Sequence, residues 1–99
     1  DIQIGLHVQV NIGCTIGHDA VLNDYVTLNP GTNVSGNVLI GEGSEIGTGS
    51  VLIPHAKIGE WSIIGAGSVV INSIAANTTS VGAPAKIIKT RNTNWQNID

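Results

Sequence analysis

The sequence is poor in the residues that usually fill a large hydrophobic core. Aromatic residues make up only 3% of its 99 positions, and it contains neither Phe nor Met. Apolar residues still account for 41%, so a core must be built from Ile, Val, Leu and Ala. Because large space-filling side chains are scarce, we expect one small domain with a thin, layered core.

The sequence also has little positive charge, no long apolar run and a single cysteine, which disfavours several classes of partner. Four Lys and Arg against seven Asp and Glu give a net charge of −3, too little positive charge for a nucleic-acid-binding patch. No apolar run approaches the roughly 18 residues of a membrane span, and no stretch has the pattern of a signal peptide. The single cysteine, Cys14, cannot form an internal disulfide. We therefore expect a cytoplasmic location with no membrane or nucleic-acid partner.

A six-residue repeat dominates what the sequence does contain. From Ile4 the chain divides into twelve consecutive hexads: IGLHVQ, VNIGCT, IGHDAV, LNDYVT, LNPGTN, VSGNVL, IGEGSE, IGTGSV, LIPHAK, IGEWSI, IGAGSV and VINSIA. The first position is Ile, Val or Leu in all twelve, the second is Gly in six, and the fifth is mostly small or β-branched. A helix would need apolar residues at i+3, where Gly, Asp or His often stands. The period instead predicts short strands separated by turns.

Stacking such units produces a parallel β-helix with the first-position side chains in interior ladders. The pattern [LIV]-G-x-x-[small]-x, over residues 4–75 and the VGAPAK that follows, resembles the hexapeptide-repeat acyltransferases. In that family three hexads form one triangular coil, and the β-helix is left-handed. The resemblance implies an all-β fold: a left-handed parallel β-helix of about four coils over residues 1–75, with a short C-terminal cap and tail at 76–99.

The beginning of the sequence leads to a further expectation. The chain opens on DIQIG, without Met and without a segment that would cap the first coil. In the resembling proteins a nucleotide-binding α/β domain precedes the β-helix. We expect this N-terminal domain to be missing from the chain, which would be the C-terminal part of a longer protein.

The dipeptide His18-Asp19 interrupts the otherwise uniform repeat. His18 occupies the third position of its hexad, in the turn, so its side chain is expected to point outward. Imidazoles ordinarily titrate near pH ~6.5, so an exposed one is mostly neutral at cytoplasmic pH and can accept a proton. Asp19 can orient the ring. The simpler alternatives are a solvated turn histidine and an Asx-turn aspartate.

Residues 11–41, NIGCTIGHDAVLNDYVTLNPGTNVSGNVLIG, resemble one branch of bacterial sugar acyltransferases more closely. That branch includes sialic acid O-acetyltransferases and nucleotide-amino-sugar N-acetyltransferases. The resemblance implies that His18 is the general base, which deprotonates a sugar hydroxyl or amine as it attacks acetyl-CoA. It implies that Asp19 raises the basicity of His18 and that Asn11 contacts the acceptor, although Asn11 also fits a plain turn residue.

Gly36 lies eighteen residues beyond His18, so a coil of three hexads stacks it on the same corner. With no side chain in the way, its backbone N–H can approach a reacting thioester and stabilise the oxyanion that forms. The resembling enzymes use the matching Gly in this way. The alternative is that Gly36 serves only to adopt a positive φ.

The resemblance also implies a path for coenzyme A. Thr48 and Ala66, one coil apart on a neighbouring corner, match positions whose backbone contacts the pantetheine arm. Lys86 in VGAPAK would meet a phosphate at the adenine end, unless it is an ordinary cap residue. Family members often carry a second His nine residues after the first; Thr27 stands there, which implies a weaker or water-mediated coenzyme contact. The site of the family lies between chains of a homotrimer.

Two other functions stay open on the same fold. A metalloenzyme like the γ-class carbonic anhydrases needs three protein ligands to zinc. The histidines here are His7, His18 and His55, without the close pair those enzymes show, so we expect no metal. A non-catalytic scaffold is the second alternative. For a transferase, sialic acid, a nucleotide-linked amino sugar and other glycan precursors all fit as acceptors, through oxygen or nitrogen, and the acyl group need not be strictly acetyl.

Overall fold

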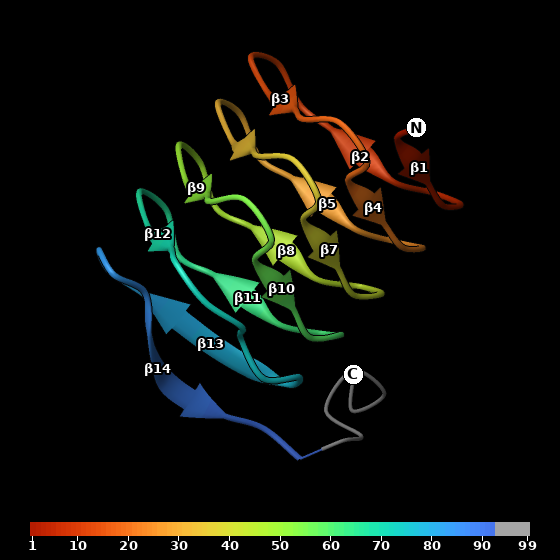
Figure 1. Cartoon of the computed structure of the whole chain (residues 1–99). Coiled ribbons are helices and arrows are strands. Elements are labelled where there is room, and N and C mark those ends of the chain that lie inside the picture. The colour runs from red at the N-terminus through yellow and green to blue at the C-terminus, as the bar shows by residue number, and fades with distance from the viewer. Residues whose placement is uncertain (93–99) are drawn as a thin grey trace.

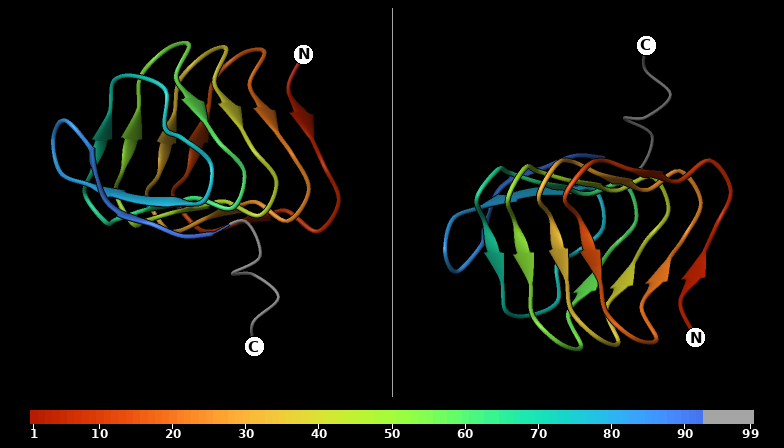
Figure 2. Two further views of the ribbon diagram at one scale, coloured as in Figure 1. Left: turned by 90° about the horizontal axis from the view of Figure 1, so that it is seen from below. Right: turned by 90° about the horizontal axis from the view of Figure 1, so that it is seen from above.

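The computed structural model describes residues 1–92, which form short strands and turns without a helix (Figure 1). The strands lie in three sheets that wrap around one axis, so that the chain winds through stacked coils (Figure 2). Sheet A contains β1 (Gln3–Ile4), β4 (Val21–Leu22), β7 (Leu39–Ile40) and β10 (Lys57–Ile58). Sheet B contains β2 (Gln9–Val10), β5 (Thr27–Leu28), β8 (Glu45–Ile46), β11 (Ile63–Ile64), β13 (Thr78–Val81) and β14 (Lys86–Thr90). Sheet C contains β3 (Thr15–Ile16), β6 (Asn33–Val34), β9 (Val51–Leu52) and β12 (Val69–Val70).

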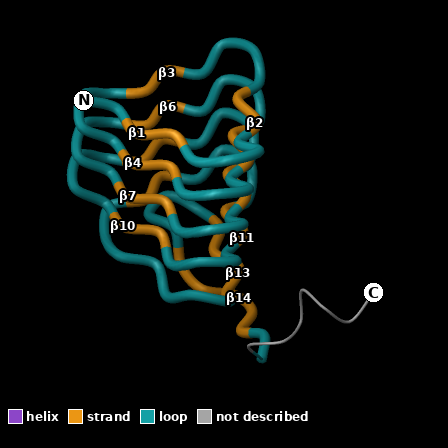
Figure 3. The backbone as a smooth tube through the Cα atoms, turned by 90° about the vertical axis from the view of Figure 1, so that its right-hand side faces the viewer, coloured by secondary structure: helices purple, strands orange, loops and turns teal. Residues whose placement is uncertain are grey.

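Strands β1 to β12 pair in parallel with partners eighteen residues along the chain. Gln3 pairs with Val21 in sheet A, and Thr15 pairs with Asn33 in sheet C. Within each coil the chain runs from sheet A to sheet B to sheet C, as the tube in Figure 3 shows. We name the turns between them corner AB, corner BC and corner CA. The predicted all-β fold, a parallel β-helix of hexapeptide repeats, is confirmed.

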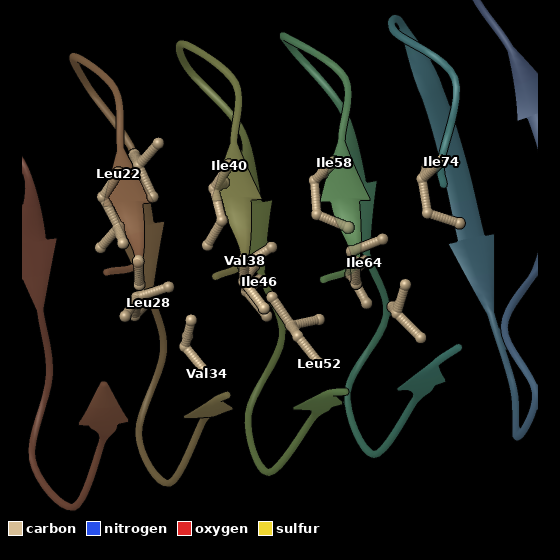
Figure 4. Packing of buried hydrophobic residues seen from close by; sticks show 14 residues of the cluster. Leu22, Leu28, Val34, Val38, Ile40, Ile46, Leu52, Ile58, Ile64 and Ile74 are labelled. Atoms are coloured by element: carbon tan, nitrogen blue, oxygen red, sulfur yellow. The ribbon is translucent and has the colours of Figure 1, made fainter. Parts of the chain in front are cut away.

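The first position of the hexad forms the interior ladders (Figure 4). Leu22, Ile40 and Ile58 stack down sheet A and are at most 2% exposed. Each such side chain contributes about 1.5–3 kcal/mol through burial of apolar surface. Ile4 and Val10 hold the same position in the first coil, yet they are 52% and 46% exposed, because β1 and β2 have a neighbouring strand on one side only.

The fifth position also faces inward, and serine fills it in the later coils. The Ser44 hydroxyl donates to the Gly59 carbonyl at 2.7 Å and accepts from the Ser62 backbone N–H at 3.0 Å. Ser50 makes the same pair of bonds one hexad later. These buried hydroxyls are satisfied, so they link successive coils at little desolvation cost.

The fourth position of the hexad adopts the left-handed conformation. In the first eleven hexads it always has a positive φ, and most of the non-glycine residues there are of the types that tolerate it, such as Asp19 (φ 56°) and Asn37 (φ 60°). Tyr25 and Trp61 take the same conformation despite their size. Because one left-handed residue occurs in each hexad, the chain turns by one corner after each strand.

Glycine is required at the second position for a different reason. A Cβ on Gly41 would lie 2.5 Å from the backbone nitrogen of Glu60, and one on Gly47 would lie 2.5 Å from that of Ala66. Neither glycine has a positive φ. They are required because the backbone of the next coil passes directly against their Cα atoms, and backbone cannot move aside as a flexible side chain can.

The predicted twelfth hexad is irregular, which corrects the uninterrupted repeat expected from the sequence. Ile74, expected at a fifth position, instead bridges to Ile58 at a first position, sixteen residues away rather than eighteen. The hexad frame restarts there, and Asn77 takes the left-handed fourth position with φ 59°. Strand β13 then extends sheet B, and β14 pairs with it antiparallel. Residues 93–99 of the expected tail lie outside the described residues.

Candidate active site

Corner CA brings His18 and Asp19 together at the surface. His18 follows β3, and its side chain is 76% exposed. Its Nδ1 lies 3.3 Å from Asp19 Oδ2, and the carboxylate itself is 56% exposed. With Nδ1–H donating to Asp19, Nε2 carries the free lone pair of the neutral ring. The outward histidine expected from its hexad position is therefore present, with its neighbour in contact.

Gly36 lies directly against the imidazole of His18. A Cβ on Gly36 would be 2.7 Å from His18 Nε2 and 2.9 Å from Cε1, so only a glycine leaves the ring in this position. Gly36 is not among the residues with positive φ, which overturns the alternative that it serves only to adopt that conformation. The requirement for glycine comes from the close approach of the ring.

The backbone N–H of Gly36 has no hydrogen-bond acceptor within residues 1–92. Its neighbours on either side are paired: Ser35 N–H donates to Leu52 O at 3.1 Å, and Asn37 N–H donates to His18 O at 2.9 Å. The second of these bonds fixes the two coils together beside the ring. An unused backbone donor next to an exposed imidazole is an arrangement that could serve as an oxyanion hole.

Two groups contact the carboxylate of Asp19. The charged amino group of Asp1 donates to Oδ1, and the His18 ring lies on Oδ2. The Asp1 amino group first, and then His18, hold the pKa of Asp19 below its ordinary value of 3.8. Asp19 is therefore ionised throughout the range in which an imidazole titrates.

The residues expected to contact coenzyme A lie elsewhere, on corner BC. Gly67 N–H donates to Thr48 O at 2.8 Å, which stacks the Thr48 and Ala66 turns one coil apart. The VGAPAK segment follows β13 and is tied to sheet C, because Val69 N–H donates to Gly82 O at 3.0 Å. Lys86 begins β14 and is exposed. The structure thus aligns Thr48 and Ala66 along one edge of sheet C, with His18 and Gly36 along the other.

Asn11 and Thr27 are placed near corner BC as well. Asn11 lies in the turn after β2, where its side-chain amide donates to Leu28 O at 2.9 Å, which leaves the side-chain oxygen and the second N–H of the amide. Thr27 lies on sheet B between Gln9 and Glu45. Neither residue touches His18 within one chain.

A groove of about 520 Å³ lies on corner AB and contains none of the predicted site residues. Asp24, Glu42 and Glu60, at eighteen-residue intervals, line it together with Leu39. Three carboxylates repel phosphate groups, so this groove does not suit coenzyme A. The eighteen-residue spacing of the acidic residues is visible in the sequence and could have predicted their alignment.

The three histidines are not gathered into a metal centre. No group of three or more His, Cys, Asp or Glu side chains within residues 1–92 is arranged to hold a metal ion. His7 stacks on Tyr25 at corner AB, with ring centroids 5.4 Å apart. In the same part of the chain, no helix has the length and apolar character needed to cross a bilayer.

Comparison with known families identifies the repeat. The family described as bacterial transferase hexapeptide (six repeats) matches residues 37–72. The chain carries the hexapeptide repeat of this family. No curated protein matches this hexapeptide-repeat chain by sequence comparison.

Solved structures share the fold of the hexapeptide-repeat chain at 34–40% identity. A His→Asn mutant of perosamine N-acetyltransferase from Caulobacter crescentus, in complex with CoA and GDP-perosamine, matches with TM-score 0.89 and 34% identity over 90% of this chain. WeeI from Acinetobacter baumannii AYE matches with TM-score 0.86 and 40% identity over 89% of this chain.

A third neighbour has a different named acceptor. Serine acetyltransferase from Brucella abortus strain S19, in complex with coenzyme A, matches with TM-score 0.83 and 32% identity over 91% of this chain. The hexapeptide-repeat chain spans about two fifths of the length of these proteins, covering 42%, 44% and 40% of them respectively.

Proposed function

We propose that the chain is the catalytic β-helix of an acetyl-CoA-dependent acetyltransferase whose acceptor is a hydroxyl or amine of a sugar or nucleotide sugar. One observation carries the proposal: the His18 ring contacts Asp19 through Nδ1 and lies with Nε2 against Gly36, whose N–H is unused. A general base and an oxyanion donor therefore face the same space. The neighbours that bind CoA, GDP-perosamine or both support this chemistry.

His18 is the general base in this mechanism. Its Nε2 takes the proton from the acceptor hydroxyl or amine as that atom attacks the thioester carbonyl carbon. The Asp19 carboxylate stabilises the imidazolium that results and holds the ring in the Nδ1–H tautomer. A bond from the acceptor oxygen or nitrogen to the acyl carbon forms in this step, and no covalent enzyme intermediate is needed.

Gly36 stabilises the charge that develops on the carbonyl oxygen. Its N–H donates to the oxyanion of the tetrahedral intermediate, an interaction typically worth about 3 kcal/mol in the transition state. Collapse of the intermediate breaks the carbon–sulfur bond, and the His18 imidazolium returns its proton to the departing thiolate of coenzyme A. The acetylated acceptor and free CoA are the products, and His18 is neutral again.

The coenzyme path along corner BC implies a homotrimer. Thr48 and Ala66 lie on one edge of sheet C, while His18 and Gly36 lie on the other. A second copy of the chain, packed around a three-fold axis, would bring its corner BC to the first copy's corner CA. It would also exclude water from a histidine that is 76% exposed in the single chain. Sedimentation of the purified protein measures this assembly.

Acetyl transfer tests the proposal. The chain is incubated with acetyl-CoA and GDP-perosamine, and in parallel with acetyl-CoA and L-serine; acetylated acceptor is measured by mass spectrometry and free CoA by thiol titration. We expect one acetylated sugar nucleotide for each CoA released, with L-serine inactive. Binding of acetyl-CoA without transfer to GDP-perosamine would overturn the sugar acceptor, and failure of a trimer to bind CoA would favour the scaffold alternative.

Replacing Asp19 with asparagine tests the charge beside the base. Asn tolerates the positive φ of this position, so the backbone is retained. We expect kcat to fall about five-fold, because an exposed carboxylate stabilises the imidazolium only modestly. Because the pKa of Asp19 is lowered, its charge is lost only in stronger acid than the charge of an ordinary aspartate, so the difference in rate between D19N and the wild type should persist until that acid range is reached.

The control for this variant is Asn37→Asp, which stands one coil below Asp19 on the same corner and also has a positive φ. This variant adds a carboxylate on the same corner and leaves unchanged the Asp19 carboxylate that contacts His18. A D19N rate equal to that of the wild type, measured across pH 5–9, would contradict a role for Asp19 in catalysis.

A further inference from the structure

The outward face of sheet C changes character at the level of the candidate base. In the first two coils it carries Thr15 on β3 and Asn33 on β6, which pair in register and are both exposed. In the next two coils the same row carries Val51 and Val69. The polar part of the row thus coincides with the two coils that supply His18 and Gly36.

Thr15 and Asn33 form a fixed polar unit. The Thr15 hydroxyl donates to Asn33 Oδ1 at 2.7 Å. This bond leaves the two N–H groups of the Asn33 amide and the lone pairs of the Thr15 oxygen facing outward. An exposed side-chain hydrogen bond contributes little to stability, and Asn is a poorer strand residue than the Val below it. Folding alone does not account for this pair.

The pair lies within reach of the reacting atoms. Thr15 precedes His18 by three residues in the first coil, and Asn33 precedes Gly36 by three residues in the second. The contact between Thr15 and Asn33 and the contact between His18 and Gly36 therefore join the same two coils. Three residues of extended chain span at most about 10 Å. A sugar ring held at His18 Nε2 would extend that far across sheet C, towards Asn11 on the opposite edge.

The polar groups of the Thr15–Asn33 pair suit a ligand with uncharged hydroxyl groups. Two amide N–H donors beside a hydroxyl oxygen match neighbouring sugar hydroxyls, each of which donates and accepts. The described cationic side chains lie elsewhere: Lys57 is on sheet A, Lys86 and Lys89 are on β14, and Arg91 donates to Trp61 O and Thr78 O. Within the described residues of one chain, the carboxylate of an amino acid acceptor would find no positive side chain on this face.

We propose that the Thr15–Asn33 pair is the acceptor-binding wall of the active site and that it selects a hydroxyl-bearing sugar ring over a free amino acid. The inference rests on the proposed acetyl transfer and adds to it the side chains that position the acceptor. Thr15 orients the Asn33 amide, and Asn33 donates to the ring. Neither residue takes part in proton transfer.

Substitution by valine tests the wall without disturbing the strand, because sheet C already carries Val51 and Val69 in the same row. In Asn33→Val we expect the KM for GDP-perosamine to rise about five- to ten-fold, and in Thr15→Val about three-fold. The kcat and the KM for acetyl-CoA should stay within two-fold of the wild type. The matched control is Asn29→Ala, which removes another exposed side-chain bond, from Asn29 to Glu45 at 3.1 Å, on corner BC rather than on the outward face of sheet C. If N33V and N29A have the same KM, the wall is overturned.

A binding measurement separates this inference from the proposed reaction. GDP-perosamine is titrated into ¹⁵N-labelled protein, and the side-chain NH₂ signals of Asn33 and Asn29 are followed. A shift of the Asn33 signal alone supports the wall, even if no acetyl transfer is detected. Acetyl transfer with an unmoved Asn33 signal would overturn the wall and leave the proposed reaction standing. If neither signal moves and no acetyl transfer occurs, both proposals fail.

Discussion

Replacing His18 with asparagine is expected to lower kcat by about 10²- to 10⁴-fold, the range that a positioned general base contributes. Asparagine cannot accept the acceptor's proton at neutral pH, so the attacking group must lose it to water. The side chain is 76% exposed, and its loss removes no core packing. We expect the melting temperature and the affinity for CoA to stay near those of the wild type. The measurement is the initial rate of acetyl transfer to GDP-perosamine at saturating acetyl-CoA.

His55→Asn is the matched control for this variant. His55 lies on the same corner two coils away, at the fourth position of its hexad, and asparagine tolerates the positive φ of that position. We expect H55N to retain the wild-type rate. If H18N keeps more than a tenth of the wild-type rate while still binding acetyl-CoA, His18 is not the base.

Replacing Gly36 with alanine is expected to lower kcat by about 10²- to 10³-fold. The new Cβ would lie 2.7 Å from His18 Nε2 and would displace the ring from the oxyanion donor. The fold should survive, because Gly36 has no positive φ and the clashing group is an exposed side chain that can rotate away. Loss of activity with an unchanged melting temperature is therefore the expected signature.

Gly31→Ala separates this effect from a general intolerance of side chains at the corners. Gly31 has φ +74°, and a Cβ at this position would lie 3.8 Å from the nearest backbone atoms of Gly49, an ordinary contact. Alanine there should destabilise the protein by about 1–2 kcal/mol through backbone strain and leave the rate per folded molecule unchanged. Equal rates for G36A and the wild type would show that neither the position of the ring nor the Gly36 donor matters for catalysis.

The six-residue period of the sequence, together with the three hexads per coil that the family resemblance implies, was enough to predict the placement of the candidate catalytic residues. A first-position aliphatic every six residues, with three hexads to a coil, places residue i beside residue i+18. The pairing of Thr15 with Asn33 follows this rule, and so does the contact between His18 and Gly36. Both depend on the regular backbone of the repeat rather than on the identity of individual side chains.

The features that the sequence did not predict depend on contacts between coils. The second-position glycines, such as Gly47, look like turn residues, but the backbone of Ala66 in the next coil imposes them. The shortened corner before Ile74 is hidden because VINSIA still begins with an aliphatic residue. The hydrogen bond from Thr15 to Asn33 requires two side-chain rotamers to agree across a strand pair, which periodicity alone does not report.

The most direct test of the central claim is where acetyl-CoA binds. Acetyl-CoA is titrated into ¹⁵N-labelled protein shown by sedimentation to be trimeric, and backbone amide signals are followed. We predict saturable shifts at Gly36, Thr48 and Ala66, about one ligand per chain, with the Gly36 amide moving as its N–H meets the thioester oxygen. Shifts confined to Glu42 and Glu60 on corner AB, with an unmoved Gly36 amide, would contradict the assignment of His18 and Gly36 as the catalytic centre.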